Sequence, residues 1–392
     1  MFDCEVILKA GTMKQTVLQV IPNLGAGGAE QSCVDIVAGL TARGYRALVV
    51  SAGGSRIAEV ERLGGKHFIH SVNSKNPFVI LKNAVWLAKF IRDKKVDVVH
   101  ARSRAPAWSA WLASRMTGRH FVTTFHAAYK FSNSFKRFYN LVMARGDRII
   151  AVSRFIAEYI TCSYDVDPDK IRVIFRGIDL TKLKLEEVNE ESRSALRDEW
   201  VVDEGQRIVL MPARLSPIKG HKVLIEAMAL LPPECGDVVA VIVGDDQGRE
   251  AYRRELEARI LSNRLADKVK LVGHCDDMPT AYSLAVVVVM PSRIPEGFGR
   301  VPVEAMAMGV PVIASDLGAT NETVQEGKTG WLLPPSNPQS WANAIAEALA
   351  MKPEQRACMA EAARLRAQTY FDRRRMISDT IAVYDELMGK DV

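Results

Sequence analysis

The chain has 392 residues, of which 48% are hydrophobic and 25% are charged, and its formal net charge at pH 7 is +6. This balance is typical of a folded globular protein and excludes a largely disordered chain. The length exceeds what one ordinary hydrophobic core contains, so we expect two domains.

The six cysteines are spread along the chain without a C-x-x-C pair, and none has a histidine at metal-ligand spacing. The sequence therefore predicts neither a zinc site nor a disulfide framework, and it suits a reducing compartment such as the cytoplasm. No apolar run approaches the roughly 18 residues of a membrane-spanning helix, and we recognise no export signal. Residues 1–14 have the pattern of an irregular leader.

The two halves of the chain differ in charge. Residues 1–185 hold 28 Lys and Arg against 14 Asp and Glu, whereas the remaining residues hold 24 against 32. A basic half is typical of proteins that bind nucleic acids, anionic membrane surfaces or acidic acceptors, and it can equally serve solubility alone.

The first predicted strand, residues 16–22, runs into a glycine-rich segment and then into a helical pattern that stops at Gly44. A strand, a glycine turn and a helix form the phosphate-binding arrangement of nucleotide folds, because glycine lets a ligand approach the backbone. The spacing is not the G-x-G-x-x-G of dinucleotide sites. Gly25, Gly27 and Gly28 are therefore equally compatible with a tight turn that binds no ligand.

Further strands are predicted at residues 46–50, 96–100, 121–124, 149–152 and 171–175, with helical patterns between them. This alternation predicts an α/β fold with a doubly wound parallel sheet. Ligands bind beyond the carboxyl ends of such strands, so the residues that follow each strand are candidates for a site.

Three such places carry polar side chains: residues 100–104, 125–127 and 153–154. Arg102 and Arg104 suit an acceptor with carboxylate or phosphate groups, and surface decoration is the alternative. A single histidine such as His126 is more often structural than functional. Residues 129–139 interleave aromatic and basic side chains, which suits an anionic membrane surface or a sugar-phosphate acceptor and, less well, single-stranded nucleic acid.

Residues 179–206 are charged and poor in large apolar side chains, so we interpret them as a linker with a domain boundary near residues 184–187. A new strand at 207–211 is followed by Arg214 and Lys219, ahead of a helical pattern. Two cations beside the free N–H groups of a helix N-terminus form a site for a diphosphate, and two surface cations are the alternative. Asp245 and Asp246 after strand 239–243 allow a metal site, but we interpret them as a glycine turn.

The Val-rich run 284–290 predicts a buried parallel strand. The loop after it contains Glu296, and a helix that begins near Pro302 and ends at Gly309 places Glu304 about one turn inside. The two carboxylates predict a clamp for a sugar and a ribose. Two solvated glutamates are the alternative.

Glu296 and Glu304, with seven residues between them, resemble the E-x7-E signature of the retaining GT-B glycosyltransferases of family four. Arg214 and Lys219 resemble the R-x4-K donor-phosphate motif of that family, and residues 27–30 are similar to its G-G-x-E turn. The resemblance covers nearly the whole chain and is strongest over residues 207–335.

The resemblance implies a GT-B fold, with two Rossmann-like doubly wound parallel-sheet domains that face a central cleft. It implies an acceptor-binding domain over residues 1–185, a donor-binding domain over residues 186–371 and a terminal helix, about 372–392, that crosses back to the first domain.

The resemblance also implies the roles of individual residues. His126 lies beside the transferred sugar in the family, and Glu304 holds the ribose. The implied catalytic residues are His126, Glu296, Arg214 and Lys219. The implied donor-binding residues are Gly27, Gly28, Arg214, Lys219, Phe298, Gly299 and Glu304.

The activity implied is transfer of a hexose from a nucleotide diphosphate sugar with retention at the anomeric carbon, and without a metal or other cofactor. A GT-B enzyme that epimerises or hydrolyses a nucleotide sugar is one alternative, and a basic nucleic-acid-binding protein is another. GDP-mannose is the first donor we expect, followed by a UDP-hexose.

Residues 99–108 look like the corresponding stretch of bacterial lipopolysaccharide core glycosyltransferases, several of them mannosyltransferases. This implies a cell-surface glycan or glycolipid acceptor such as lipopolysaccharide core, with Arg102 and Arg104 near an acidic core sugar. We expect a cytoplasmic protein that makes peripheral contact with the anionic inner face of the membrane and binds no nucleic acid.

Overall fold

The computed structural model describes residues 15–25 and 27–389, so the predicted leader lies outside the described residues. The chain divides into two compact units. The N-terminal unit contains the residues up to Ala151 together with Ile160–Arg172 and the chain from Ile377 on. The C-terminal unit contains Val152–Tyr159 and Val173–Met376, so the expected boundary near residues 184–187 falls inside it.

The N-terminal unit is built on a seven-stranded sheet with the order β3-β2-β1-β4-β5-β6-β7. The pairs from β3 to β6 are all parallel. The strands are β1 (Thr16–Val20), β2 (Arg46–Ser51), β3 (Lys66–Ile69), β4 (Val98–Ala101), β5 (His120–Phe125), β6 (Arg148–Ala151) and β7 (Ile171–Val173). The predicted strands are confirmed. Strand β3 was missed because it lies at the edge of the sheet and is only four residues long, with no fully buried side chain.

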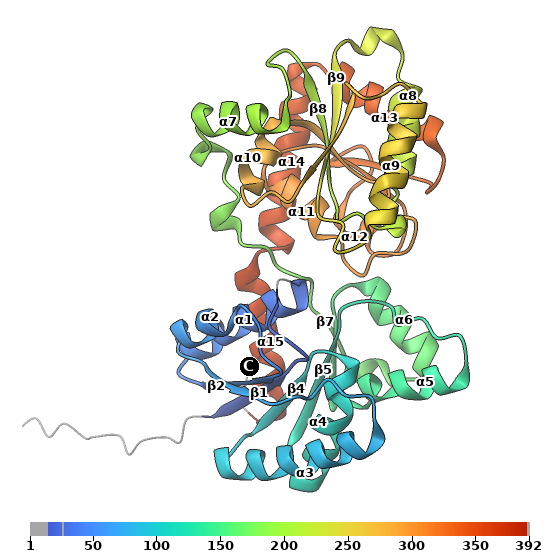
Figure 1. The fold of residues 1–392 in the computed structure, drawn as a ribbon. Helices are drawn as coiled ribbons and strands as arrows, with labels where there is room; N and C mark the ends of the chain where they lie inside the picture. Colours follow the sequence, from blue (N-terminus) through green and yellow to red (C-terminus); the bar gives the residue numbers. More distant parts are fainter. Residues whose placement is uncertain (1–14, 26, 390–392) are drawn as a thin grey trace, which may run out of the picture. The chain divides into compact units, whose positions relative to one another are not determined.

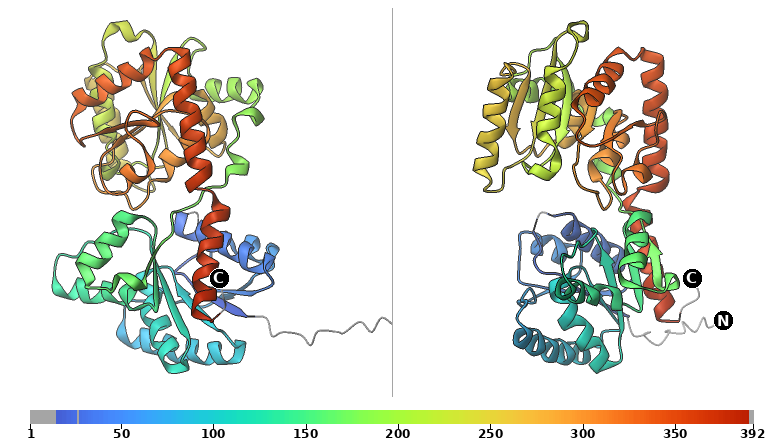
Figure 2. Two further views of the ribbon diagram at one scale, coloured as in Figure 1. Left: turned by 180° about the vertical axis from the view of Figure 1, so that it is seen from behind. Right: turned by 90° about the vertical axis from the view of Figure 1, so that its right-hand side faces the viewer.

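Helices lie on both faces of this sheet, with α3 on one side and the terminal helix α15 on the other (Figures 1 and 2). The helices of this part of the chain are α1 (Gly28–Ala42), α2 (Ile57–Arg62), α3 (Pro77–Lys94), α4 (Arg104–Thr117), α5 (Ser134–Leu141), α6 (Arg154–Tyr164) and α15 (Arg373–Leu387). The N-terminus of helix α3 is stabilised, because Asn76 caps it and Pro77 occupies its first position.

Buried hydrogen bonds and ion pairs hold helix α15 against the sheet. The hydroxyl of Tyr384 lies 2.6 Å from His100 Nδ1, and Thr124 Oγ1 lies 2.7 Å from the other ring nitrogen. Burial, reinforced by the nearby Arg102 and His126, keeps the pKa of His100 well below its ordinary value. The ring is therefore neutral at pH 7, and its hydrogen bond with Tyr384 connects β4 with α15.

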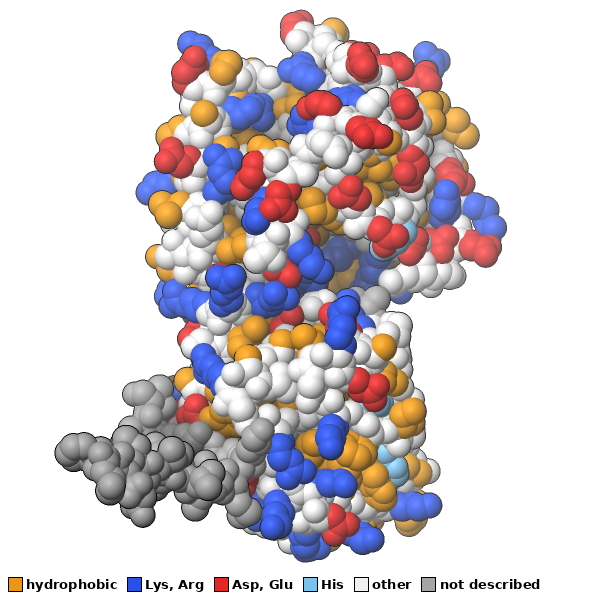
Figure 3. Space-filling model, turned by 90° about the vertical axis from the view of Figure 1, so that its left-hand side faces the viewer, with side chains coloured by type: hydrophobic (Ala, Val, Ile, Leu, Met, Phe, Trp, Pro, Cys, Tyr) orange, Lys and Arg blue, Asp and Glu red, His pale blue; other side chains and the backbone are white. Residues whose placement is uncertain are grey.

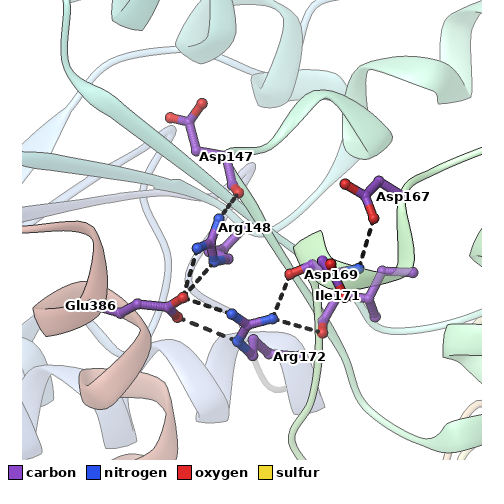
Figure 4. Close-up of polar contacts among 7 residues, drawn as sticks. All are labelled: Asp147, Arg148, Asp167, Asp169, Ile171, Arg172 and Glu386. Atoms are coloured by element: carbon purple, nitrogen blue, oxygen red, sulfur yellow. Dashed lines mark hydrogen bonds and ion pairs between the residues drawn. The ribbon is translucent and has the colours of Figure 1, made fainter. Parts of the chain in front are cut away.

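Glu386 in α15 binds two arginines from neighbouring strands, as Figure 4 shows. Arg148 of β6 and Arg172 of β7 each approach one carboxylate oxygen at 2.6 Å. Hydrogen bonds from Arg148, then from Arg172, lower the pKa of Glu386. Both guanidinium groups also donate to backbone carbonyls at the strand ends, so the last turn of α15 is joined to the sheet edge.

The C-terminal unit has a six-stranded sheet with the order β10-β9-β8-β11-β12-β13, and every pair is parallel. Its strands are β8 (Arg207–Pro212), β9 (Val238–Val243), β10 (Val269–Gly273), β11 (Ala285–Met290), β12 (Val312–Ser315) and β13 (Gly330–Leu333). The order reverses at β8, so the loops after β8 and β11 leave the sheet at its topological switch point, where α/β folds bind ligands.

Helices α8, α9 and α13 cover one face of this sheet and α14 covers the other (Figure 2). The helices are α7 (Glu190–Trp200), α8 (His221–Ala229), α9 (Glu250–Ser262), α10 (Met278–Leu284), α11 (Arg300–Ala307), α12 (Thr320–Thr323), α13 (Pro338–Ala350) and α14 (Pro353–Tyr370). The core contains the fully buried Trp341 of α13, which packs among aliphatic side chains from the strands and from α8.

The prediction that residues 179–206 form a linker is wrong in one respect, because this segment contains helix α7. Asn189 caps this helix, and Leu196 and Trp200 are buried on one side of it. Arg193 donates to the carbonyl of Ser283 at the end of α10. Two apolar residues one turn apart were too few to stand out among the charges of this segment.

In the described part of the chain, no helix combines the length and the apolar character that crossing a membrane requires.

Replacing Gly39 in α1 by Ala tests the docking of α15. A Cβ atom at Gly39 would lie 2.1 Å from Ile377 Cγ2. Alanine favours a helix by up to about 1 kcal/mol over glycine, but overpacking costs about 1–3 kcal/mol. We therefore expect Gly39→Ala to lower the melting temperature by several degrees. Gly25→Ala is the control, since nothing lies within 4 Å of its Cβ. A higher melting temperature for Gly39→Ala would contradict the close approach of the two helices.

Candidate functional site

The loop between β8 and α8 packs directly on the loop that follows β11. Gly220 ends a short 3-10 helix, Pro217–Lys219, and has a φ of +80°. A Cβ atom at Gly220 would lie 1.8 Å from the carbonyl oxygen of Pro291. Only glycine allows both this φ and this approach, so the two loops meet backbone to backbone.

The contact between the loops brings Lys219 next to Glu296. Lys219 Nζ donates to Glu296 Oε1 at 2.6 Å, and the hydroxyl of Ser292 donates to the same oxygen at 2.6 Å. The side chains of Lys219 and Glu296 are only 23% and 20% exposed. Two residues 77 positions apart, each predicted separately, therefore lie side by side.

Arg214 lies on the same loop with a fixed backbone and an exposed side chain. The N–H of Ala213 donates to Val243 O, and the N–H of Leu215 donates to Asp245 O, both at 2.8 Å. Within the described residues the guanidinium group has no hydrogen-bond or ion-pair partner. Arg214 therefore offers an uncompensated cation near the N-terminus of α8.

The two aspartates in the turn after β9 make hydrogen bonds within that turn and to the neighbouring loop. Asp246 Oδ1 accepts a hydrogen bond from the N–H of Gly248 at 2.8 Å, and its carbonyl accepts one from Arg249. Together with the contact of the Asp245 carbonyl with Leu215, this agrees with our interpretation of the pair as turn residues.

Glu296 is also positioned through its backbone. It forms a bridge with Gly318, and its carbonyl accepts a hydrogen bond from Ala319 at 3.0 Å. Gly318 has a φ of +70°, and a Cβ there would lie 2.5 Å from Glu296 O. The loop after β12 therefore supports the loop that carries Glu296.

Glu304 sits in α11 as predicted and is held by two side chains. Arg300, one turn earlier, donates to Oε1 at 2.7 Å, and the hydroxyl of Tyr282 donates to Oε2 at 2.9 Å. Tyr282 is fully buried, and burial together with Glu304 raises its pKa well above the ordinary value. Glu304 lines a pocket of about 560 Å³, with Arg300 and the loop after β10 also in its wall.

Sequence analysis missed Arg300, Tyr282 and Ser292. The four-residue spacing of Arg300 and Glu304 on one helix face was a signal for the first. Nothing in the sequence places Tyr282 beside Glu304, because that contact crosses from α10 to α11, and the contact of Ser292 with Glu296 depends on how the loop after β11 folds.

Phe298 and Gly299 differ in what they expose. Phe298 is 2% exposed, and its ring packs edge-on against Phe371 with 5.5 Å between centroids. Only the backbone of Phe298 is therefore accessible to a ligand. Gly299 has a φ of +82° and precedes α11, whose first-turn N–H groups have no acceptor within the helix.

Residues 153–154, singled out because they follow β6, have positioning contacts within the C-terminal unit. The Ser153 hydroxyl donates to Gly297 O at 2.8 Å. The carboxylate of Glu322 accepts from the backbone N–H groups of Arg154 and Phe155, both at 2.7 Å. Glu322 thus caps helix α6, and Ser153 supports the glycine loop next to Glu296.

In the N-terminal unit, Gly27 and Gly28 start helix α1, and a Cβ at Gly27 would meet the carboxylate of Glu30. His126 directly follows β5 and is half-buried. Arg102 differs from expectation, because it is 2% exposed and donates to Gln19 Oε1 at 2.5 Å and to Ser32 Oγ at 3.1 Å. It joins β4 to β1 and α1, and it is not the surface group that was expected.

His221 opens helix α8 directly after Lys219 and Gly220. Burial lowers the pKa of His221 to about 4, although hydrogen bonding to the backbone of Ala213 and Ser216 opposes the shift. The ring is therefore neutral at pH 7 and lies beneath the loop that carries Arg214 and Lys219.

Comparison with known families agrees with this geometry. Residues 192–366 match the family model described as "Glycosyl transferases group 1", and residues 26–182 match the one described as "Glycosyltransferase Family 4". The two matches together span both units of the chain.

Solved structures with the same fold are known. A glycosyltransferase from Rickettsia africae ESF-5 is 33% identical, with a TM-score of 0.90 over 97% of this chain and 100% of its own. Anabaena Alr3699/HepE, solved in complex with UDP and glucose, is 27% identical with a TM-score of 0.80, over 94% of this chain and 98% of its own.

Two further comparisons involve enzymes named for particular pathways or substrates. The D-inositol 3-phosphate glycosyltransferase of Jonesia denitrificans is 30% identical over 74% of this chain and 71% of its own length. WaaG, a glycosyltransferase involved in lipopolysaccharide biosynthesis, is 18% identical with a TM-score of 0.71, over 95% of this chain and 100% of its own. The second likeness shows the fold alone.

The buried His221 predicts a specific pH dependence of stability. The unfolded chain binds a proton on this ring below about pH 6.5, whereas the folded protein resists it down to about pH 4. The ring's contribution is thus present above pH 6.5 and is lost as the pH falls toward 4. Linkage gives a loss of about 2 kcal/mol between pH 7 and pH 5. We expect His221→Gln to unfold more easily at pH 7 but to lose less stability on acidification.

Urea unfolding midpoints at pH 7 and pH 5 measure this difference. His274→Gln, which replaces an exposed histidine, is the control and should keep the wild-type dependence. Equal acid sensitivity of the wild type and His221→Gln would show that His221 is not buried in its neutral form.

Proposed function

The chain belongs to the glycosyl transferases group 1 and has the GT-B fold, and from this membership we propose that it is a retaining glycosyltransferase that moves a hexose from a nucleotide diphosphate sugar. The observation that carries the proposal is the pairing of Lys219 with Glu296, with the exposed Arg214 on the same loop as Lys219. A carboxylate for sugar hydroxyls and two cations for phosphates then lie at one helix N-terminus.

The proposed reaction is a same-face substitution. The bond between the anomeric carbon and the diphosphate oxygen breaks, a bond to the acceptor hydroxyl oxygen forms, and the acceptor proton passes to a phosphate oxygen of the leaving group. Negative charge grows on the diphosphate in the transition state. Arg214, Lys219 and the first-turn N–H groups of α8 stabilise that charge, so the proposal needs no metal.

Glu296 and Glu304 are proposed to hold the donor at its two ends. Glu296 accepts hydrogen bonds from hydroxyls of the hexose, and Glu304 accepts them from the ribose. Their fixed geometry supports these roles, because Ser292, Tyr282 and Arg300 each hold a carboxylate oxygen. Such preorganised acceptors lose little freedom when the donor binds.

We assign three further roles as part of the proposal. His126 acts as a catalytic residue in sugar transfer, the N–H groups at Gly27 and Gly28 bind an anionic group, and the backbone at Phe298 and Gly299 contacts the donor phosphates. The donor is a UDP-hexose or GDP-mannose. The complex of HepE with UDP and glucose supports testing a UDP-sugar first.

The proposed acceptor is a cell-surface glycan or glycolipid, such as lipopolysaccharide core, reached by peripheral contact with the anionic membrane face from the cytoplasm. A relative named for D-inositol 3-phosphate supports an acceptor that carries phosphate. An epimerase or hydrolase would instead release free sugar or an isomeric nucleotide sugar when no acceptor is supplied.

Alanine substitution of the two cations tests the proposal. We expect Arg214→Ala and Lys219→Ala each to lower kcat by roughly 10²-fold or more, as when a preorganised charge stabiliser is removed, with melting temperatures close to wild type. Lys222→Ala is the matched control, since Lys222 lies in the first turn of α8, close in sequence to Lys219, and pairs with Glu255. Near-normal turnover in both site variants would reject the assignment.

A thermal-shift panel of UDP, GDP and ADP, read for the wild type and for Glu304→Gln, identifies the donor base. We expect one nucleotide to raise the melting temperature of the wild type clearly and to raise that of Glu304→Gln less, because the ribose loses a hydrogen-bond acceptor.

With the donor known, NMR of the product should show the anomeric configuration of the donor, also after EDTA treatment. Inversion, or activity lost on chelation, would contradict the proposed mechanism.

A further inference from the structure

A second pocket, of about 510 Å³, lies wholly within the N-terminal unit. Its lining residues come from the start of α4, from α5 and the segment before it, and from the segment before α3. The side chains that carry the inference are Lys75, Arg104, Lys130, Phe135, Lys136 and Tyr139.

Four of these side chains are cations without a counter-ion. Among the described residues that line the pocket there is no aspartate or glutamate. None of the four cations forms an ion pair with another described residue, in contrast to Lys219 of the donor site. Four like charges around one pocket repel each other, and an anionic ligand would relieve that repulsion.

Arg104 is held rigidly at the wall of the pocket. One guanidinium nitrogen donates to Asn140 Oδ1 at 3.0 Å, and the group lies over the ring of Tyr129, 4.4 Å from its centroid. Asn140 is itself fixed by a hydrogen bond to Tyr129 O. A preorganised arginine of this kind suits phosphate better than a mobile surface lysine does.

Two neutral donors complete the pocket. Ser103 precedes the 14-residue helix α4 and makes no side-chain cap, so the positive end of that helix lies at the wall. The hydroxyl of Tyr139 is buried, and no other described residue bonds to it. A buried hydroxyl without a partner is costly, and a ligand oxygen would satisfy it.

Exposed apolar side chains lie in the wall of this basic pocket and on helix α3, which begins two residues after Lys75. Phe135 in its wall is 77% exposed, and Phe78, three residues after Lys75, is 82% exposed. Phe78, Leu81 and Val85 follow one another at helical spacing and are all exposed, so they form one stripe on α3. Basic and hydrophobic side chains also lie next to one another on the different face of the molecule that Figure 3 shows.

We propose that this pocket binds the phosphate of an anionic lipid headgroup, with Phe135 and the α3 stripe in contact with the acyl region of the membrane. A phosphopeptide or a nucleic acid would satisfy the cations but would leave the apolar stripe in water. The inference names a site for the membrane contact of the proposed function. It is tested without nucleotide sugar, so its failure and the failure of the donor assignment are separate results.

Vesicle flotation with the full chain tests the site. We expect binding to vesicles of phosphatidylcholine and phosphatidylglycerol, and none to phosphatidylcholine alone. The double substitution Lys130→Ala with Lys136→Ala should weaken binding by roughly 25-fold, at about fivefold for each cation near an anionic surface. The matched control is Arg62→Ala with Lys66→Ala, which removes the same charge from exposed residues of this unit outside the pocket.

Two single substitutions distinguish a specific lipid-binding site from general electrostatic attraction to an anionic membrane. Phe135→Ser should reduce vesicle binding several-fold at the same net charge. Tyr139→Phe should weaken vesicle binding while leaving the melting temperature unchanged or higher, since the hydroxyl has no described protein partner to lose. A lower melting temperature with unaltered binding would show that the hydroxyl is structural and would count against the site.

Three results would overturn the proposal. Equal loss of binding in the pocket and control double variants would mean that only overall charge matters. Absence of binding to anionic vesicles would exclude the lipid. A thermal shift with soluble glycerol phosphate that depends on Lys130 and Lys136, without vesicle binding, would assign the pocket to a free phosphate compound.

Discussion

The candidate donor site depends on one backbone contact, the approach of Gly220 to the carbonyl of Pro291. The contact joins the loops after β8 and β11, which leave adjacent strands at the switch point of the sheet. It places Lys219 where its amine reaches Glu296, and His221 lies under the same loop as a neutral, buried ring. The remaining donor-side groups are arranged around this junction, because Gly318 supports Glu296 and the turn after β9 holds Arg214.

Much of the fold and part of the site could be predicted from the sequence. Parallel strands buried on both faces leave continuous Val-rich runs such as 284–290, and glycines mark where loops turn, so the alternation of elements was readable. The spacing of Glu296 and Glu304, and of Arg214 and Lys219, carries local information because each pair lies within one loop-and-helix segment. Helix α7 and the edge strand β3 were missed because few of their side chains are buried.

Contacts between distant segments could not be predicted. The pairing of Lys219 with Glu296 and the bond from Tyr282 to Glu304 depend on sheet order, which no local pattern encodes. Two side chains are also buried although no local pattern in the sequence indicated it. Arg102 looked like a surface group yet fills a buried position between β4, β1 and α1, and the ring of Phe298 belongs to the core. Arg102 and Arg104 are two positions apart, yet Arg102 is 2% exposed whereas Arg104 lines a pocket.

Helix α15 has a consequence for biosynthesis. Its residues from Ile377 on complete the N-terminal unit, although the whole of that unit's sheet is translated much earlier. Until the ribosome has made the end of the chain, His100 lacks Tyr384, and Arg148 and Arg172 lack Glu386. The nascent N-terminal unit therefore emerges with an uncovered sheet face, and the C-terminal unit, whose residues end at Met376, is the first whose sequence is complete. A stop codon that removes only this last helix would leave the donor-side residues intact and the other unit unfinished.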